Sequence, residues 1–336
     1  MSDSSAKRDN KHIGPADKGT EITPERKHVY TRLTRVETIP KAGRRRGGIS
    51  NNRAMTGTSI MSKADQIFID MCGNILENGS SSEGQSVRAR WEDGAPAHTI
   101  KMFGVVNRYD LSNEFPALTL RPTPVNLCVD EMLWIWQKKS NKIADLNSRI
   151  WDEWANADGE IGKAYGYQMG LKYRFSQGEM DQVDNVLWQL KHTPYSRRII
   201  TNVYNFNDLH EMVLEPCAYS MTFNVTGNKL NAILNQRSQD ILTANNWNVV
   251  QYSVLVHMLA QVSDLEVGEL IHVISDAHIY DRHIDMVKEL IRRPAYPAPK
   301  FRLNPDISDF YSFTAGDAGI TDYHANPQIV GIPIAI

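Results

Sequence analysis

The chain has 336 residues, 41% of them hydrophobic and 23% charged, which is typical of a globular protein and excludes a wholly disordered one. It contains no run of about 18 apolar residues, so we expect no membrane-spanning helix. The formal net charge of −2 averages two unlike parts, because residues 1–60 carry a net +7 and the remainder a net −9.

Residues 1–61 form the first predicted region, a basic N-terminal extension that we predict to be disordered. It is poor in aromatic residues, and Arg44, Arg45 and Arg46 stand next to each other within it. Such a composition cannot bury enough apolar surface to fold alone. Two interpretations stay open: an arm that binds nucleic acid or another acidic partner, and a solvated extension without a role. The region lacks the apolar core of a secretory signal.

The next elements follow from hydrophobic periodicity along residues 62–204. The pattern predicts a helix over 67–76 that ends at Gly79, a strand over 100–109 and a helix over 125–136. A further helix is expected over 183–190 and a short strand over 199–204. Glu131 is embedded in the strongly apolar helix over 125–136.

The second half of the chain opens with the clearest strand pattern. Apolar and polar residues alternate over 219–225, a turn follows at 226–228, and a second strand covers 229–237. We then expect a helix over 249–262, a strand over 270–274 and a helix over 283–292, before prolines interrupt the pattern. With no linker visible after residue 61, we predict one domain over 62–336 with an α/β (α+β) fold.

Three cysteines, Cys72, Cys128 and Cys217, cannot form a disulfide framework, which favours a reducing compartment and predicts a cytoplasmic protein. Cys217 has two interpretations. A lone thiol is usually a buried, inert residue. Neighbouring guanidinium groups would instead favour its thiolate and make it a nucleophile, and paired arginines also suit a phosphate or a carboxylate.

Several segments, in this order and spacing, resemble the thymidylate synthase family. The resemblance runs from about residue 62 to residue 336. The segments that carry it are Ile150-Trp151-Asp152-Glu153-Trp154, Ala164-Tyr165-Gly166-Tyr167-Gln168, Pro194-Tyr195-Ser196-Arg197-Arg198-Ile199-Ile200, Glu215-Pro216-Cys217, Gln236-Arg237-Ser238-Gln239-Asp240 with Asn248, Asp276-Ala277-His278-Ile279-Tyr280, and the ending Pro333-Ile334-Ala335-Ile336.

The resemblance implies a thymidylate synthase-like fold, with a mixed β-sheet, flanking helices and one sheet face that forms the interface of a homodimer. It implies an enzyme that transfers a one-carbon unit from 5,10-methylenetetrahydrofolate to C5 of a pyrimidine nucleotide monophosphate. The expected reaction converts dUMP to dTMP and releases dihydrofolate. The folate is a co-substrate, and no metal is expected.

The resemblance also assigns catalytic roles. Cys217 would supply the thiolate that adds to C6 of the pyrimidine and so makes C5 reactive. Glu131 would serve proton transfer at O4 and C5, since a carboxyl group in an apolar helix tends to a raised pKa. Tyr165 would assist removal of the C5 proton. Asn248 would read the uracil through its amide, and Asp240 would lie between base and folate.

Substrate and co-substrate contacts complete the implied site. The 5′-phosphate would be held by Arg88, Arg197, Arg198, Arg237 and Ser238, with Arg197 and Arg198 donated by the partner subunit. The remaining nucleotide contacts would come from Gln236, Asp240, Asn248, His278 and Tyr280, the last two at the deoxyribose hydroxyl. The folate would contact Trp151, Trp154, Asp240, Ala244, Trp247, Ala335 and Ile336, with Ile336 closing over the pocket.

Several of these residues also have a purely structural interpretation. Glu131 could be a helix-face carboxylate paired with an arginine, the tryptophans could be core residues, and His278 could be a surface residue. The joint occurrence of the motifs in family order favours the functional interpretation.

Five positions depart from the family's common pattern near the expected reaction centre: Ala244 for Gly, Asn246 for Pro, Trp247 for Phe, Ser275 for Gly and Ala218 for His. They leave a second hypothesis open, a 5-hydroxymethylase acting on dUMP, CMP or dCMP, in which water and not hydride traps the methylene intermediate. Retention of Asn248 favours uracil over cytosine. A third hypothesis is a nucleic-acid-binding protein that uses the basic extension.

Overall fold

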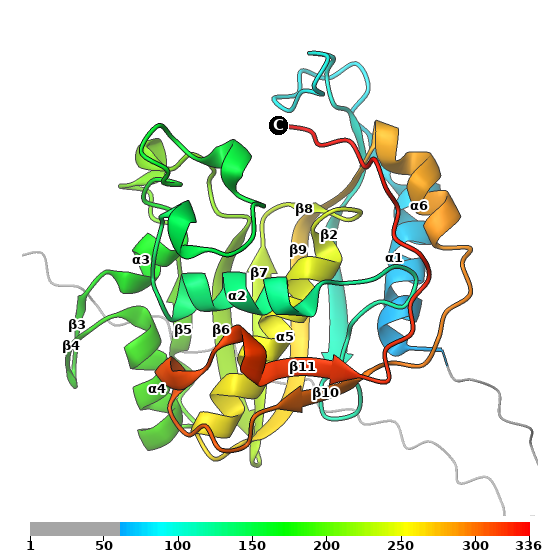
Figure 1. The fold of residues 1–336 in the computed structure, drawn as a ribbon. Helices are drawn as coiled ribbons and strands as arrows, with labels where there is room; N and C mark the ends of the chain where they lie inside the picture. The colour runs from blue at the N-terminus through cyan, green and yellow to red at the C-terminus, as the bar shows by residue number, and fades with distance from the viewer. Residues whose placement is uncertain (1–60) are drawn as a thin grey trace, which may run out of the picture. The chain divides into compact units, whose positions relative to one another are not determined.

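A mixed seven-stranded sheet runs through the part of the chain that the structure, a computed structural model, describes: residues 61–336 (Figure 1). Its strand order is β1-β2-β9-β7-β6-β5, with β8 paired to β9. The predicted α/β (α+β) fold with a mixed sheet and flanking helices is therefore confirmed. The predictions for residues 1–60 lie outside the described residues, and the domain boundary after residue 61 stays a prediction.

The strands of the main sheet are β1 (Ser80–Ser81), β2 (Thr99–Asp110), β5 (Ile199–Asn202), β6 (Ala218–Thr226), β7 (Lys229–Gln236), β8 (Gln239–Asp240) and β9 (Glu266–Tyr280). The strands β7 and β8 pair with β9 in parallel, and the other neighbours pair antiparallel. Two small hairpins lie outside this sheet: β3 (Tyr173–Phe175) with β4 (Gly178–Met180), and β10 (Lys300–Leu303) with β11 (Ala318–Thr321).

The α-helices are α1 (Lys63–Asn78), α2 (Val125–Trp136), α3 (Gly166–Gly170), α4 (Gln182–His192), α5 (Asn245–Val262) and α6 (Ile284–Leu290). Short 3₁₀ helices cover Ile143–Asp145, Asp152–Trp154, Leu209–Glu211, Asp281–His283, Phe310–Ser312 and Ala315–Asp317. None of the described helices is both long enough and apolar enough to cross a bilayer.

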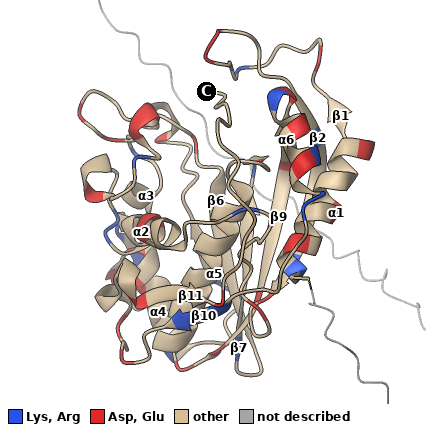
Figure 2. Ribbon diagram, turned by 45° about the vertical axis from the view of Figure 1, so that its right-hand side comes forward, with Lys and Arg blue, Asp and Glu red and all other residues tan. Residues whose placement is uncertain are grey.

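The helix α5 forms the centre of the core. It connects the parallel strands β7 and β9, packs on both and also contacts α2. It contains no Lys, Arg, Asp or Glu (Figure 2), and most of its side chains are buried. A helix that is apolar on all sides belongs in a protein interior. The few polar side chains of α5 must therefore find partners inside the protein.

The sheet buries one face. Along β7 and β9 buried residues alternate with half-buried ones, as the period of two in a strand requires. On β2 and β5, Phe103, Val106 and Ile200 are exposed by 89%, 55% and 47%. Apolar side chains on a sheet face are usually covered in the working protein. The prediction that a sheet face forms a dimer interface stays a prediction.

Most predicted elements are confirmed, with differences at their ends. The helix over 125–136 matches α2. The helix α5 begins at Asn245, four residues before the predicted start at 249, because its first turn is polar and the apolar pattern does not include it. The strand β9 continues beyond the predicted end at 274 to Tyr280, because it keeps pairing with β2 and gains β8. The two small hairpins were not predicted.

The two ends of α1 show how local residues set an element. At its start the Ser62 hydroxyl accepts hydrogen bonds from the N–H groups of Ala64 and Asp65, at 3.1 and 3.4 Å, as an N-cap does. At its end Gly79 lies against the backbone of β2. A Cβ atom there would stand 2.3 Å from the carbonyl oxygen of Ile75 and 2.7 Å from Cγ2 of Ile100.

We therefore expect Gly79→Ala to lower the free energy of unfolding by about 1–3 kcal/mol, because a methyl group must displace backbone. The matched control is Gly73→Ala within α1, where a new Cβ meets no atom within 4 Å. That change should stabilise the protein by about 0.5–1 kcal/mol. Urea titration of both variants measures the two effects, and equal stabilities would contradict the prediction.

Candidate active site

Cys217 lies directly before β6, where the strand β7 ends beside it. The backbone N–H of Arg237 donates to the carbonyl oxygen of Cys217 at 3.0 Å. The guanidinium of Arg237 also donates to the carbonyl oxygens of Pro216 and Glu215, at 3.0 and 2.6 Å. Arg237 thus fixes the segment that carries the thiol, so the structure brings together two residues that lie 20 positions apart in the sequence.

The Cys217 thiol is half-buried, whereas Cys72 and Cys128 are buried. Burial raises the pKa of the Cys217 thiol, and the positive charges of Arg237 and Arg88 act against that rise. Burial also raises the pKa values of Cys72 and Cys128, near which no arginine has this effect. Of the three thiols, Cys217 therefore has the environment of a nucleophile.

Tyr165 contacts both Cys217 and Trp151, one of the residues predicted to contact the folate. Its hydroxyl oxygen accepts a hydrogen bond from the backbone N–H of Cys217 at 2.9 Å. Its ring lies edge-on to Trp151, with the centroids 5.5 Å apart. Tyr165 has φ +40°, a left-handed conformation that costs a non-glycine residue energy. Strain of this kind is common at functional sites.

Glu131 is 5% exposed and points to three N–H donors. Trp151 Nε1 donates to Oε1 at 2.6 Å, Gln251 Nε2 donates to Oε2 at 3.1 Å, and Trp247 Nε1 also donates to Oε2. Burial raises the pKa of Glu131, and these three donors act against the rise. No salt bridge within residues 61–336 includes Glu131, so the alternative of a carboxylate paired with arginine is wrong.

Asn248 is joined to the same carboxylate through Gln251. Its Nδ2 donates to Gln251 Oε1 at 3.3 Å, and its Oδ1 accepts from Gln236 Nε2 at 3.3 Å. Gln236 pairs with Ala218 across β6 and β7. The predicted base-reading amide and the predicted nucleophile therefore lie beside the same strand pair.

Asp240 is held by hydrogen bonds from the loop that precedes α5. Its carboxylate accepts hydrogen bonds from the N–H groups of Leu242 and Thr243 and from the Thr243 hydroxyl. His283 Nδ1 lies 3.7 Å from Asp240 Oδ1, an ion-pair distance. Burial favours the neutral acid, but the His283 and Thr243 contacts outweigh it and lower the pKa of Asp240.

His278 and Tyr280 project from β9, next to β8. His278 Nδ1 bonds to Asp276 Oδ1 at 2.8 Å, and His278 is 7% exposed, so the surface interpretation of this residue is wrong. Burial raises the pKa of Tyr280 to about 12, and the charges of Asp240, Arg88 and Cys217 also influence it. These groups therefore lie within electrostatic range of one another.

The C-terminal residues reach the same region. Ile336 and Arg90 exchange two backbone hydrogen bonds of 2.9 and 2.7 Å, and His283 Nε2 donates to the carbonyl oxygen of Pro333 at 2.8 Å. Ala335 precedes this pairing. Trp154 lies edge-on to Trp151, with the ring centroids 5.8 Å apart. Ser238 is half-buried between Arg237 and β8.

Arg197 and Arg198 are not brought to this site. Both are exposed and directly precede β5, where Ile199 pairs with Phe223. Phe223 lies six residues from Cys217 along β6, which corresponds to about 20 Å of strand. Within one chain the two arginines are therefore separate from the thiol.

Sequence reasoning missed Gln251 and His283. Gln251 follows Trp247 by four positions and Asn248 by three, which places the three on one face of α5. A buried amide in a helix without charges is the signal that could have found it. His283 was predicted only as the start of a helix.

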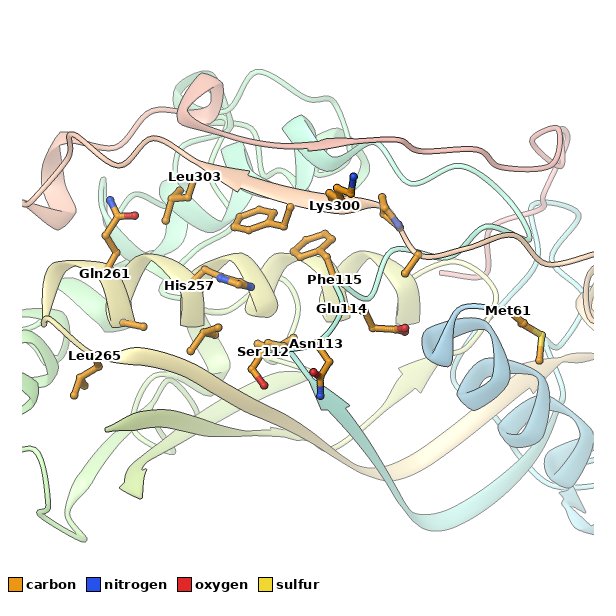
Figure 3. Close-up of a pocket in the computed structure, with 16 residues that line it drawn as sticks. Met61, Ser112, Asn113, Glu114, Phe115, His257, Gln261, Leu265, Lys300 and Leu303 are labelled. Atoms are coloured by element: carbon orange, nitrogen blue, oxygen red, sulfur yellow. The ribbon is translucent and has the colours of Figure 1, made fainter. Parts of the chain in front are cut away.

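A cavity of about 900 Å³ lies elsewhere, between the helix α5 and the strand β10 (Figure 3). Phe115 and Phe301 stack there with centroids 4.5 Å apart, next to His257. None of the predicted site residues lines it. Residues 61–336 contain no cluster of His, Cys, Asp and Glu that could hold a metal ion.

A half-buried thiol, nearby arginines and a buried carboxylate joined by side-chain amides are groups that suit an enzyme acting on a polar substrate. Comparison with known proteins identifies the family. The family model described as thymidylate synthase matches residues 66–335. The chain belongs to the thymidylate synthase family and is thus an enzyme of the methyltransferase class.

Individual relatives agree. The thymidylate synthase of Bacillus licheniformis is 45% identical over 268 residues, which cover 78% of this chain and 96% of the relative. That of Bacillus phage phi3T is 42% identical over 275 residues, covering 80% and 98%. The solved structure of thermostable thymidylate synthase A from Bacillus subtilis has a TM-score of 0.77 at 40% identity, covering 81% of this chain and 99% of that one.

Arg88 provides a test of the electrostatics at Cys217, because it lowers the pKa of the thiol by charge. We expect Arg88→Met to raise that pKa and to slow alkylation of Cys217 by iodoacetamide about two- to threefold near neutral pH, where less thiolate remains. Peptide mass spectrometry measures the rate. Arg108→Met, which removes an exposed charge paired with Glu269 on the sheet, is the control. Equal slowing in both variants would refute a local effect.

Proposed function

We propose that the enzyme methylates dUMP at C5 to give dTMP, with Cys217 as the nucleophile. The observation that carries the proposal is the position of Gln236. Its backbone pairs with Ala218, next to the thiol, and its side chain bonds Asn248 in the chain that leads to Glu131. A nucleophile, a base-reading amide and a proton-transfer group can therefore act on one pyrimidine ring.

The chemistry follows from the weak nucleophilicity of C5 in uracil. When the Cys217 thiolate bonds to C6, the electron pair of the C5–C6 double bond moves toward O4 and leaves an enolate that is reactive at C5. Glu131 stabilises and moves protons at O4, and Tyr165 assists removal of the C5 proton. After the one-carbon unit has bonded to C5 and the C5 proton has left, a hydride reaches the new carbon and the S–C6 bond breaks, which restores the C5–C6 double bond and frees the thiolate.

The residues present fit a folate co-substrate. Trp151, Trp154 and the half-buried Trp247 offer aromatic surface on one side. Asp240, whose pKa is lowered, offers an ionised carboxylate for the N–H groups of a pterin. Members of the family use 5,10-methylenetetrahydrofolate, which supplies both the one-carbon unit and the hydride. Ala244, Ala335 and Ile336 would contact it from the helix start and the C-terminal segment.

The phosphate site would combine Arg88, Arg237 and Ser238 with Arg197 and Arg198 of a second subunit. The separation of the last two from Cys217 within one chain supports donation across an interface. The exposed apolar residues of β2 and β5 support a homodimer that covers this sheet face. His278 and Tyr280 would contact the deoxyribose.

The hydroxymethylase alternative requires water at the exocyclic methylene. The tight packing around Glu131, which two indoles and one amide leave 5% exposed, favours hydride transfer and hence methylation. A role for the basic extension in nucleic-acid binding concerns residues outside the described part.

The product decides between these reactions. We expect the enzyme to convert dUMP and 5,10-methylenetetrahydrofolate to a nucleotide heavier by one CH₂ and to dihydrofolate, as measured by mass spectrometry. A product that gains CH₂O, together with tetrahydrofolate, would instead establish hydroxymethylation. Cys217→Ser should lower kcat by at least about 1,000-fold, while Cys128→Ser, which alters a buried thiol, should keep the nucleophile.

Mixing two inactive variants tests the donated arginines. We expect Arg197→Ala combined with Arg198→Ala, and separately Cys217→Ser, to be inactive as pure dimers. After exchange of subunits, a mixed dimer has one intact site, so about a quarter of the wild-type activity should return with random pairing. No recovery in dimers shown to be mixed would mean that each site uses arginines of its own chain.

A further inference from the structure

Four buried or half-buried side chains form one continuous hydrogen-bonded row that ends at Glu131. His272 Nε2 contacts Gln236 Oε1, Gln236 Nε2 contacts Asn248 Oδ1, Asn248 Nδ2 contacts Gln251 Oε1, and Gln251 Nε2 contacts Glu131 Oε2. Gln236 and Gln251 are each 2% exposed, and His272 is fully buried. At such depth water cannot replace a lost partner, so each amide depends on the next.

The carboxylate sets the direction of the whole row. When Glu131 is ionised, its carboxylate only accepts hydrogen bonds, so the Gln251 NH₂ group faces Glu131 and Gln251 Oε1 faces Asn248. Turning the Gln251 amide over would place two acceptor oxygens about 3.1 Å apart, with no proton between them. The N–H groups of Trp151 and Trp247 on the same carboxylate favour its ionised form.

The other end of the row agrees with this direction. Burial lowers the pKa of His272 to about 3, so its ring is neutral and carries one proton. With that proton on Nε2, it donates to Gln236 Oε1, and Gln236 Nε2 is left to donate to Asn248. The amide of Asn248 is thus held from both sides, with its nitrogen toward Gln251 and its oxygen toward Gln236.

This leaves Asn248 one free N–H on the Gln251 side and one free lone pair on the Gln236 side. Uracil presents the O4 acceptor next to the N3–H donor, which matches this order. Cytosine presents the N4 amino donor next to the N3 acceptor, which opposes it at both atoms. A freely turning asparagine could match either base.

We infer that Gln251 is a specificity-determining positioning residue, which transmits the direction set by Glu131 to the Asn248 amide and so selects uracil over cytosine. This inference rests on the proposed function, in which Asn248 reads the base. Gln251 itself does not contact the nucleotide in this scheme, and its effect passes through Asn248.

The test compares binding of dUMP and dCMP to the full-length protein by calorimetry, which needs no turnover. We expect Gln251→Met, close in shape but without the amide, to lower the preference for dUMP over dCMP about tenfold. The matched control is Gln261→Met on the same helix, which loses two hydrogen bonds to the carbonyl oxygens of Asn304 and Ile307, at 2.9 and 2.8 Å. It should keep the wild-type preference.

A second variant covers the case in which Gln251→Met does not fold. Gln251→Lys places an ammonium group, which only donates hydrogen bonds, between Glu131 and Asn248. The Asn248 oxygen must then turn toward position 251, so the preference for dUMP over dCMP should fall, as in Gln251→Met.

The outcomes separate the inference from the proposed function. A wild-type protein that binds dUMP no better than dCMP would refute base reading by Asn248 and the inference with it. A wild-type preference for dUMP that persists in folded Gln251→Met or Gln251→Lys would overturn the inference alone and leave the proposed function standing.

Discussion

The buried carboxylate of Glu131 is the constraint on which the site depends. Placing an acidic side chain in the apolar helix α2 is unfavourable unless donors surround it. The protein supplies three donors from two segments: Trp151 from the connection after α2, and Trp247 and Gln251 from α5. One side chain thereby determines how the start of α5 and the Trp151 segment lie against α2, and its two oxygens organise the side chains around them.

At the Cys217 thiol, burial and positive charge have opposite effects on the pKa. Burial of the Cys217 segment works against the thiolate, because it raises the pKa of the thiol. The charges of Arg237 and Arg88 offset this cost. Arg237 also fixes the backbone before Cys217, so one residue contributes to both the position and the charge of the site. If the partner's arginines join it, the completed site becomes more positive than a single chain shows.

The sequence allowed much of this to be predicted, for physical reasons. Helix α2 and the β6–β7 hairpin were predictable because their apolar periodicity is strong and local. The start of α5 and the end of β9 were not, since the first has a polar turn and the second depends on pairing with β2 and β8. Cys217, Glu131 and Asn248 were found through motifs. Gln251 was not, because its importance arises only from contacts between α2 and α5.

Three departures from the common family pattern, Ala244, Asn246 and Trp247, lie together at the start of α5. Ala244 has φ −111°, a conformation open to any residue, so the methyl group brings no strain where glycine is usual. Asn246 bonds Thr123 and accepts a hydrogen bond from the N–H of Leu118, which anchors the first turn of α5. That turn presents Trp247 to Glu131, and Gln251 follows one turn later on the same face. Asn246 and Trp247 therefore act in the same turn, where one anchors the helix start and the other reaches Glu131.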